Sequence, residues 1–136
     1  MNYIQTLNHF SKQHVRKMGR AQPEAAIQRA VIQHLHIRGA PHLVFVHVPN
    51  GGKRPRIEAA ILKSMGVRAG ASDLLLWHDH KFFALELKAP RGRLAESQQK
   101  FLDDMETAGG NVAVAVGLDD ALRILERWQL LRGCLS

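Results

Sequence analysis

The stretch Phe82-Phe83-Ala84-Leu85-Glu86-Leu87-Lys88 decides the fold, because it places an acid and a base one residue apart inside an apolar run. A run of this kind predicts a buried strand, in which alternate side chains point to the same face. Glu86 and Lys88 therefore share one face. Burying two charged groups costs free energy unless a partner or a bound ion compensates for it, so this pair needs an explanation.

A second strand precedes this one. Residues 72–77 are mostly apolar, and the polar residues 78–81 predict a turn. If Asp79 and His80 form a two-residue loop, the numbers of antiparallel partners sum to 159, and Asp73 lies opposite Glu86. Directly opposed residues have Cβ atoms about 5 Å apart. The register is a hypothesis, because Asp-His is not a preferred pair for a hairpin turn.

The remaining chain predicts helices and strands in the order α-β-α-β-β-α-β-α, an α/β fold with a mixed central sheet flanked by helices. Helical phase turns Glu24 toward the core side of the first helix and places Gln98 on an inner stripe. In the helix predicted at residues 55–65, the apolar residues Ile57, Ile61 and Met65 are expected to face inward. The other predicted elements are helices at 23–38, 55–65, 95–108 and 119–131 and strands at 43–48 and 111–116.

Composition indicates one globular domain at residues 22–136, preceded by a basic arm at residues 1–21. The 136 residues contain no apolar run long enough to cross a membrane and no apolar leader, and Cys134 is the single cysteine. These features predict a protein of a reducing compartment such as the cytoplasm, and not a secreted one. The net charge of +7 favours polyanion binding.

The spacing Asp-x12-Glu-x-Lys, from Asp73 to Lys88, suits phosphodiester hydrolysis. Carboxylates supply the oxygen ligands that Mg²⁺ or Mn²⁺ requires, and a lysine can position water or neutralise charge developing on the phosphate. The Leu87 carbonyl is a possible further ligand, and Glu24 could complete the ligand set or bind a second ion. The alternative is a structural ion pair at the end of a strand.

Basic residues surround two loops. Asn50, Gly51 and Gly52 lead into a helix start, where glycines and free N–H groups favour phosphate, although an ordinary strand-to-helix turn would look the same. The cations expected to contact nucleic acid are Lys53, Arg54, Arg56, Lys63, Arg91 and Arg93. The paired histidines lack cysteine partners, which argues against structural zinc.

The motifs Pro49-Asn50-Gly51-Gly52, Gly70 to Leu76, Leu85-Glu86-Leu87-Lys88, and Gly92-Arg93-Leu94 with Gln98 together resemble the VRR-NUC domain of the PD-(D/E)xK nuclease superfamily. The resemblance spans about residues 22–131 and implies a restriction-endonuclease-like core and divalent-metal-dependent DNA cleavage. It implies that Asp73 and Glu86 bind metal, that Lys88 is catalytic, and that Glu24 and Gln98 match the helix-one acid and the glutamine after the Gly-Arg loop.

Two positions depart from the family pattern. Ser72 stands where the superfamily signature has proline, and Ala95 stands where a serine or threonine often caps the following helix. Losing the cap costs about 1 kcal/mol of local stability. Neither departure removes a catalytic group.

The resemblance to stand-alone phage and bacterial members implies a homodimeric, structure-selective endonuclease that acts on branched DNA, like a Holliday-junction resolvase in recombination or DNA repair. One alternative is a flap or fork-type repair nuclease. A second is a non-catalytic DNA-binding module that retains the fold, and a third is a basic protein that binds RNA or an acidic protein.

Overall fold

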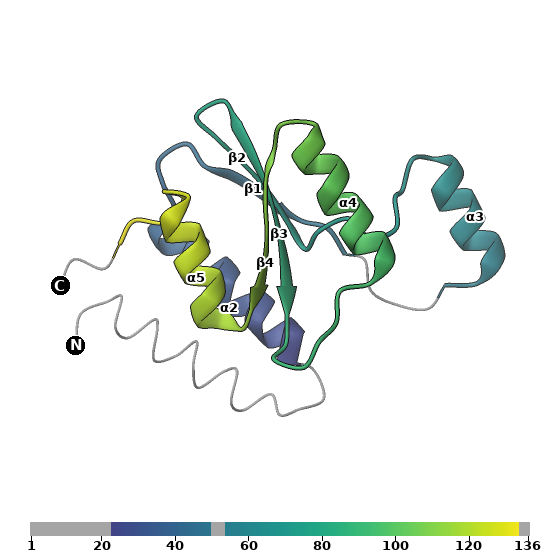
Figure 1. Cartoon of the computed structure of the whole chain (residues 1–136), viewed down its shortest axis with the longest axis horizontal. Helices are drawn as coiled ribbons and strands as arrows, with labels where there is room; N and C mark the ends of the chain where they lie inside the picture. Colours follow the sequence, from purple (N-terminus) through teal and green to yellow (C-terminus); the bar gives the residue numbers. More distant parts are fainter. Residues whose placement is uncertain (1–22, 50–53, 134–136) are drawn as a thin grey trace.

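The computed structural model describes residues 23–49 and 54–133, and its centre is a four-stranded mixed sheet (Figure 1). The strands lie in the order β1-β2-β3-β4. The first three form an antiparallel meander, and β4 runs parallel to β3. Their bounds are β1 Val44–His47, β2 Leu74–His78, β3 Lys81–Lys88 and β4 Asn111–Val116. The predicted α/β class and mixed sheet are confirmed.

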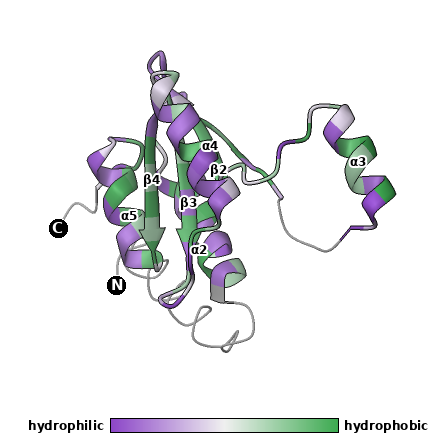
Figure 2. Cartoon of the chain, turned by 45° about the vertical axis from the view of Figure 1, so that its right-hand side comes forward, coloured by the Kyte–Doolittle hydropathy of each residue, from purple (hydrophilic) through white to green (hydrophobic). Residues whose placement is uncertain are grey.

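Helices cover both faces of the sheet (Figure 1). The helices α2 and α5 lie together on one face, and α4 lies on the other. The helix α3 stands apart from the sheet in both overall views (Figures 1 and 2). The bounds are α2 Pro23–Arg38, α3 Arg56–Ser64, α4 Glu96–Thr107 and α5 Leu118–Arg127.

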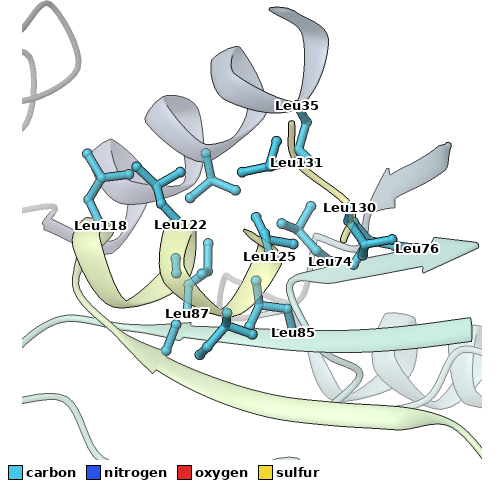
Figure 3. Close-up of a cluster of buried hydrophobic side chains, with 14 of the residues drawn as sticks. Leu35, Leu74, Leu76, Leu85, Leu87, Leu118, Leu122, Leu125, Leu130 and Leu131 are labelled. Atoms are coloured by element: carbon cyan, nitrogen blue, oxygen red, sulfur yellow. The ribbon is translucent and has the colours of Figure 1, made fainter. Parts of the chain in front are cut away.

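The larger core fills the space between the sheet and the α2–α5 pair. Alternation along β3 sends Phe83, Leu85 and Leu87 into it, where they meet leucines from both helices (Figure 3). Each fully buried leucine contributes about 1.5–3 kcal/mol. A smaller cluster on the opposite face joins Ala84 to Phe101 and Leu102 of α4. The even-numbered residues of β3 therefore face α4, and this is the face that carries Glu86 and Lys88.

The hairpin between β2 and β3 has the predicted register. His78 pairs with Lys81 and Leu74 with Leu85, so partner numbers sum to 159. Both loop residues adopt left-handed backbone, with φ of 51° at Asp79 and 62° at His80. Two positive φ values match a tight hairpin turn whose twist suits the strands, and Asp and His tolerate this region better than most residues.

The predicted inward face of α3 is wrong. Ile57, Ile61 and Met65, here called the α3 stripe, are 77%, 54% and 75% exposed, and no residue of α3 is buried. Apolar periodicity identifies one face of a helix, but it does not say what covers that face. Because α3 stands off the sheet (Figure 2), its stripe stays exposed instead of joining the core.

The last helix is shorter than predicted. It ends at Arg127, and Gln129 adopts a φ of 63°, which turns the chain. Leu130 and Leu131 thereby leave the helix and enter the larger core, and Leu131 forms a bridge with Gly39. Their apolar character, which resembles a continuation of the helical stripe, reflects burial in a turn.

Some predictions concern residues outside the described part of the chain. The basic arm at residues 1–21 and the loop residues Asn50, Gly51, Gly52 and Lys53 are among them. Within residues 23–49 and 54–133, none of the helices combines the length and the apolar character that crossing a bilayer requires.

Candidate active site

The carboxyl half of β3 carries the two charged groups that the sequence singles out. Glu86 and Lys88 are buried, with 3% and 8% of their surface exposed. The Lys88 Nζ lies 3.7 Å from the Glu86 Oε1. This distance makes an ion pair but is too long for a strong hydrogen bond. The amine is therefore close enough to balance charge on Glu86 without being tied to it.

Asp73 lies just before β2, beside this pair. Its Oδ2 accepts a hydrogen bond from the Leu87 backbone N–H at 2.7 Å, so the carboxylate reaches across to β3. Its carbonyl accepts from the Val48 N–H at 3.0 Å and lies 2.8 Å from the His47 Nδ1. Contacts from β3 and from the β1 side thus fix Asp73 from two directions, and the predicted juxtaposition of Asp73 and Glu86 is present.

Gln98, in the first turn of α4, joins this site to the helix start. Its Nε2 donates to the Glu86 Oε1 at 2.7 Å, while its Oε1 accepts from the Ala95 backbone N–H at 2.8 Å. The second bond satisfies one of the unpaired N–H groups at the helix start. Ala95 has no side-chain cap to offer, so Gln98 both caps α4 and orients the Glu86 carboxylate.

The electrostatics of Glu86 are unusual. Burial raises the pKa of Glu86 to about 8, and the neighbouring Asp73 carboxylate adds to the rise, while Lys88 opposes it. The second oxygen, Oε2, is buried and has no hydrogen-bond partner among the described residues. A buried carboxylate oxygen without a partner is costly. The site therefore favours either a proton or a cation at this oxygen.

Glu24 and Leu87 border the site differently. The Glu24 side chain is exposed rather than turned to the core, and its Oε1 is 3.4 Å from the Ala89 N–H. A Cβ at Gly92 would come within 2.9 Å of that oxygen, so the loop after β3 passes closely over Glu24. Among the described residues, no three His, Cys, Asp or Glu side chains gather to hold a metal. Metal binding by Glu24 and by the Leu87 carbonyl stays a prediction.

The predicted nucleic-acid contacts fall into two groups around the site. Arg91 and Arg93 are exposed on the loop that follows β3. Arg54, Arg56 and Lys63 are exposed on and before α3. Arg54 and Lys63 also line a groove of about 840 Å³ between α3 and α4, called here the α3–α4 groove.

Three further residues lie near the site. From sequence, His47 could either line the cleft or be an ordinary strand histidine, whereas no role was predicted for Arg68 and Lys100. His47 contacts the Asp73 carbonyl, and Arg68 and Lys100 line the α3–α4 groove. The contact of His47 depends on how β1 aligns with β2, where His47 pairs with Leu74. A lysine on a polar helix face, such as Lys100, carries no signal in sequence that separates it from solvated ones.

A model of the VRR-NUC domain family matches residues 22–119. The chain belongs to this family. A solved structure described as a VRR_NUC domain protein has a TM-score of 0.64 at 21% identity, with 79% of this chain and 88% of that chain covered. At this identity the likeness concerns the fold, which it confirms. No curated protein matches the chain.

Membership of the VRR-NUC family indicates a nuclease of the PD-(D/E)xK type, and such domains generally use divalent metals and act on DNA. The residues of this VRR-NUC domain fit a hard cation. Asp73 and Glu86 supply carboxylate oxygens, and the unpaired Glu86 Oε2 is an available ligand atom. A divalent cation commonly uses one or two protein carboxylates and completes its shell with water and substrate phosphate.

Proposed function

We propose that the protein is a Mg²⁺- or Mn²⁺-dependent DNA endonuclease that acts on branched DNA. The observation that carries the proposal is Glu86, a buried carboxyl group with a raised pKa and an unpaired oxygen, surrounded by Asp73, Lys88 and Gln98. A carboxyl group with a shifted pKa, placed beside a lysine and a second carboxylate, is typical of catalytic sites.

Asp73 and Glu86 would hold the cation, with the Leu87 carbonyl and Glu24 as further candidates. When bound, the cation would act as a Lewis acid on the scissile phosphate and lower the pKa of water. The chain's own contribution is the fixed position of the two carboxylates, because Asp73 is bonded to Leu87 and Glu86 to Gln98. Fixed ligands lose little conformational entropy when they bind.

Lys88 supplies a positive charge next to the reacting phosphate. In hydrolysis a water oxygen attacks phosphorus and loses a proton, and the bond from phosphorus to one sugar oxygen breaks. Negative charge grows on the phosphoryl oxygens during this step, and a buried amine stabilises it more strongly than an exposed one would. The 3.7 Å separation from Glu86 leaves the Lys88 amine free to turn toward the phosphate.

Exposed cations on two sides of the site would position the DNA backbone. Arg91 and Arg93 follow β3, and Arg54, Arg56 and Lys63 belong to the α3 region. Contacts to phosphate set the register and orientation of DNA on a protein without reading its sequence.

A homodimer is part of this proposal. The α3 stripe is an unpartnered apolar face, and Val44, Val46 and Trp77 form a second exposed apolar patch on β1 and β2. Exposed apolar patches of this size mark interaction sites. In a two-fold symmetric dimer, the α3 stripe and the β1–β2 patch of one copy would contact surfaces of the other copy. The dimer would also have two active sites, which suits paired cuts.

The proposal is tested with linear, flap, fork and four-way-junction DNA in Mg²⁺ or Mn²⁺. Lys88→Met should bind branched DNA and lose at least about a hundredfold in cleavage rate, as expected when one charge-stabilising group is removed. Lys81→Met is the matched control, because Lys81 is exposed at the other end of β3. Equal cleavage by Lys88→Met and the wild-type protein would refute the catalytic role of Lys88.

The same panel separates the alternatives. Symmetric paired nicks near a four-way crossover support a resolvase of recombination, and single cuts at flaps or forks support a repair nuclease. Binding without cleavage under every metal condition would leave a non-catalytic DNA-binding module. The location of the enzyme in the cytoplasm of a bacterial or phage-infected cell is part of the same proposal.

A further inference from the structure

The α3–α4 groove lies beside the active site and has no role in the chemistry described above. Its volume of about 840 Å³ is within the range of a pocket for a flexible ligand, and its walls come from α3, the segment after α3, and the first turns of α4. Ser97 lines the groove, and the next residue, Gln98, bonds Glu86. A ligand that contacts Ser97 would therefore lie next to Gln98, the residue that bonds the Glu86 carboxylate.

The groove carries strongly unequal charge. Its lining includes Arg54, Lys63, Arg68 and Lys100, against the single acid Asp104 among the described lining residues. Asp104 is already engaged, since its Oδ2 lies 2.5 Å from Arg68 and 3.4 Å from Lys100, and the hydrogen bond from Arg68 lowers the pKa of Asp104. The groove thus complements a polyanion.

The lining is also apolar between the cations. Pro49, Leu62, Val67 and Ala69 contribute surface to the same walls. A duplex presents phosphates while its base faces are stacked inside, so it would not use apolar walls. A single strand exposes base faces, which can contact apolar surface, together with phosphates. Proteins that bind single strands combine cations along the backbone with aromatic rings or arginine guanidinium groups on which bases stack.

Arg68 lines the groove and is held in place by two contacts. Its guanidinium lies 5.1 Å from the centre of the Phe101 ring and is bonded to Asp104, while 45% of its side chain stays exposed. A guanidinium that is fixed against an aromatic ring keeps a planar face on which a base can stack. Little side-chain entropy remains to be lost when a strand binds.

Backbone packing couples the groove to the site. Gly70 has a φ of 83°, and a Cβ there would lie 2.3 Å from the Ser97 carbonyl oxygen. The segment from Ala69 to Asp73 is thus pressed against the start of α4, with one end in the groove and the other at the catalytic carboxylate. A single DNA strand that runs from the groove along residues 69–73 would therefore reach Asp73.

We infer that the α3–α4 groove binds the single-stranded arm of branched DNA and so selects substrates with an unpaired strand next to the cut. This inference rests on the proposed nuclease function for its biological meaning, and it favours the flap or fork substrates of that proposal, because a four-way junction has no single-stranded arm. Binding to the groove itself does not depend on catalysis, so the two can fail separately.

The test measures fluorescence anisotropy of a labelled oligo-dT, a forked duplex with a dT arm, and a blunt duplex, all in EDTA. Lys100→Glu should weaken binding of the oligo-dT and the fork about tenfold, and should lower the salt slope by about one contact, with a smaller effect on the blunt duplex. Leu62→Gln, which keeps the charge, should weaken the oligo-dT about threefold. Lys81→Glu is the control of equal charge change, and it lies outside the groove.

Equal losses for Lys100→Glu and Lys81→Glu, or equal losses on fork and blunt duplex, would overturn the inference and leave only general charge attraction. An effect confined to single-stranded RNA would do the same. Circular dichroism checks that each variant is folded. If the wild-type protein cleaves no DNA, the proposed function fails while the anisotropy result for the groove still stands. If it cleaves forks and Lys100→Glu keeps the fork preference, the groove inference alone fails.

Discussion

The Gln98 amide donates to the Glu86 Oε1 across 2.7 Å, and so ties the first turn of α4 to the charged face of β3. The same side chain accepts from the Ala95 N–H. One glutamine therefore stabilises a helix start and holds a carboxylate at a fixed angle. The orientation of a metal-binding carboxylate often depends on such an outer partner.

Replacement of Gln98 tests this link. Gln98→Ala removes both hydrogen bonds, and we expect Mn²⁺ affinity to fall about tenfold because Glu86 loses its orienting partner. The unfolding free energy should fall by about 1 kcal/mol through loss of the cap. Isothermal titration with Mn²⁺ and urea unfolding measure the two effects.

Gln99→Ala is the matched control for that experiment. Gln99 is the next residue of α4, is exposed, and bonds Asp103 at 2.9 Å rather than any residue of the site. It should leave Mn²⁺ affinity unchanged. Similar affinity losses in both variants would show that Gln98 acts through the stability of α4 and not through Glu86.

The raised pKa of Glu86 predicts how stability depends on pH without metal. In the folded protein Glu86 keeps its proton up to a pKa of about 8, whereas its ordinary value is 4.5. Between these values the folded state binds more protons than the unfolded state, so the free energy of unfolding falls as pH rises. From about pH 6.5 to 8.5 the loss should be about 2 kcal/mol, or several degrees in melting temperature.

The window starts at 6.5 because a second buried group acts in the opposite direction. Burial lowers the pKa of His34 to about 4 from 6.5, so its contribution grows as pH rises through that lower range and is complete above it. Melting curves in EDTA over the upper range therefore report Glu86. Glu86→Gln should flatten them, and an equal slope in that variant would contradict the assignment.

Metal should reverse the trend at Glu86. Binding requires the deprotonated carboxylate, so Mg²⁺ should raise the melting temperature more near pH 8 than near pH 6.5. The same titration tests whether a cation compensates the two acids, since Asp73 disfavours the ionised form of Glu86 when no cation is bound. A melting temperature that is indifferent to Mg²⁺ at both pH values would count against metal binding at this pair.

Much of this site could be predicted from local periodicity. Period-two alternation places Glu86 and Lys88 on one face, and the length of the hairpin loop places Asp73 beside them. Helical phase brings Gln98 to the same side. Each of these relations depends on residues close in sequence or joined by a tight turn, where backbone geometry leaves few alternatives.

Contacts between segments that are far apart in the sequence could not be predicted from local periodicity. The bond from the Asp73 carboxylate to the Leu87 N–H, and the contact of His47 with Asp73, depend on how three strands align at their ends. The exposure of Glu24 could not be predicted either, because it depends on the path of the loop after β3, which passes over Glu24. The outward stripe of α3 is the largest miss, because an apolar face predicts burial but does not name its partner.

Two glycines offer a test of the contact between the groove segment and α4. Gly66 and Gly70 both have positive φ, of 99° and 83°, but only Gly70 lies against other atoms, the Ser97 carbonyl oxygen among them. Gly66→Ala should cost about 1 kcal/mol through backbone strain alone. Gly70→Ala should cost about 2 kcal/mol more because α4 must shift.

Urea unfolding of the two glycine variants measures these costs. A shift of α4 would also displace Gln98, so Gly70→Ala should bind Mn²⁺ more weakly than Gly66→Ala does, when both are measured under conditions where they are folded. Equal stabilities would show that the segment before Asp73 yields easily, and that its packing on α4 does not hold the site in place.

The α3 stripe predicts the oligomeric state. Ile57 and Met65 are among the most exposed large apolar side chains described, so a dimer that covers them gains burial at little cost to the monomer. A stable dimer buries about 1,600 Å² in total, so neighbouring polar residues would have to join the stripe and the β1–β2 patch in the interface. Ile57→Ser with Met65→Ser should therefore dissociate the dimer in analytical ultracentrifugation.

The melting temperature of the same double variant, measured at a concentration where the wild-type protein is monomeric, should change little, because no residue of α3 is buried. Ala60→Ser, on the same helix but outside the stripe, is the matched control and should leave the dimer intact. A wild-type protein that sediments as a monomer at high concentration would remove the homodimer from the proposal. A double variant that stays dimeric would instead move the interface away from α3, because the serine hydroxyls would otherwise be buried against apolar surface without partners.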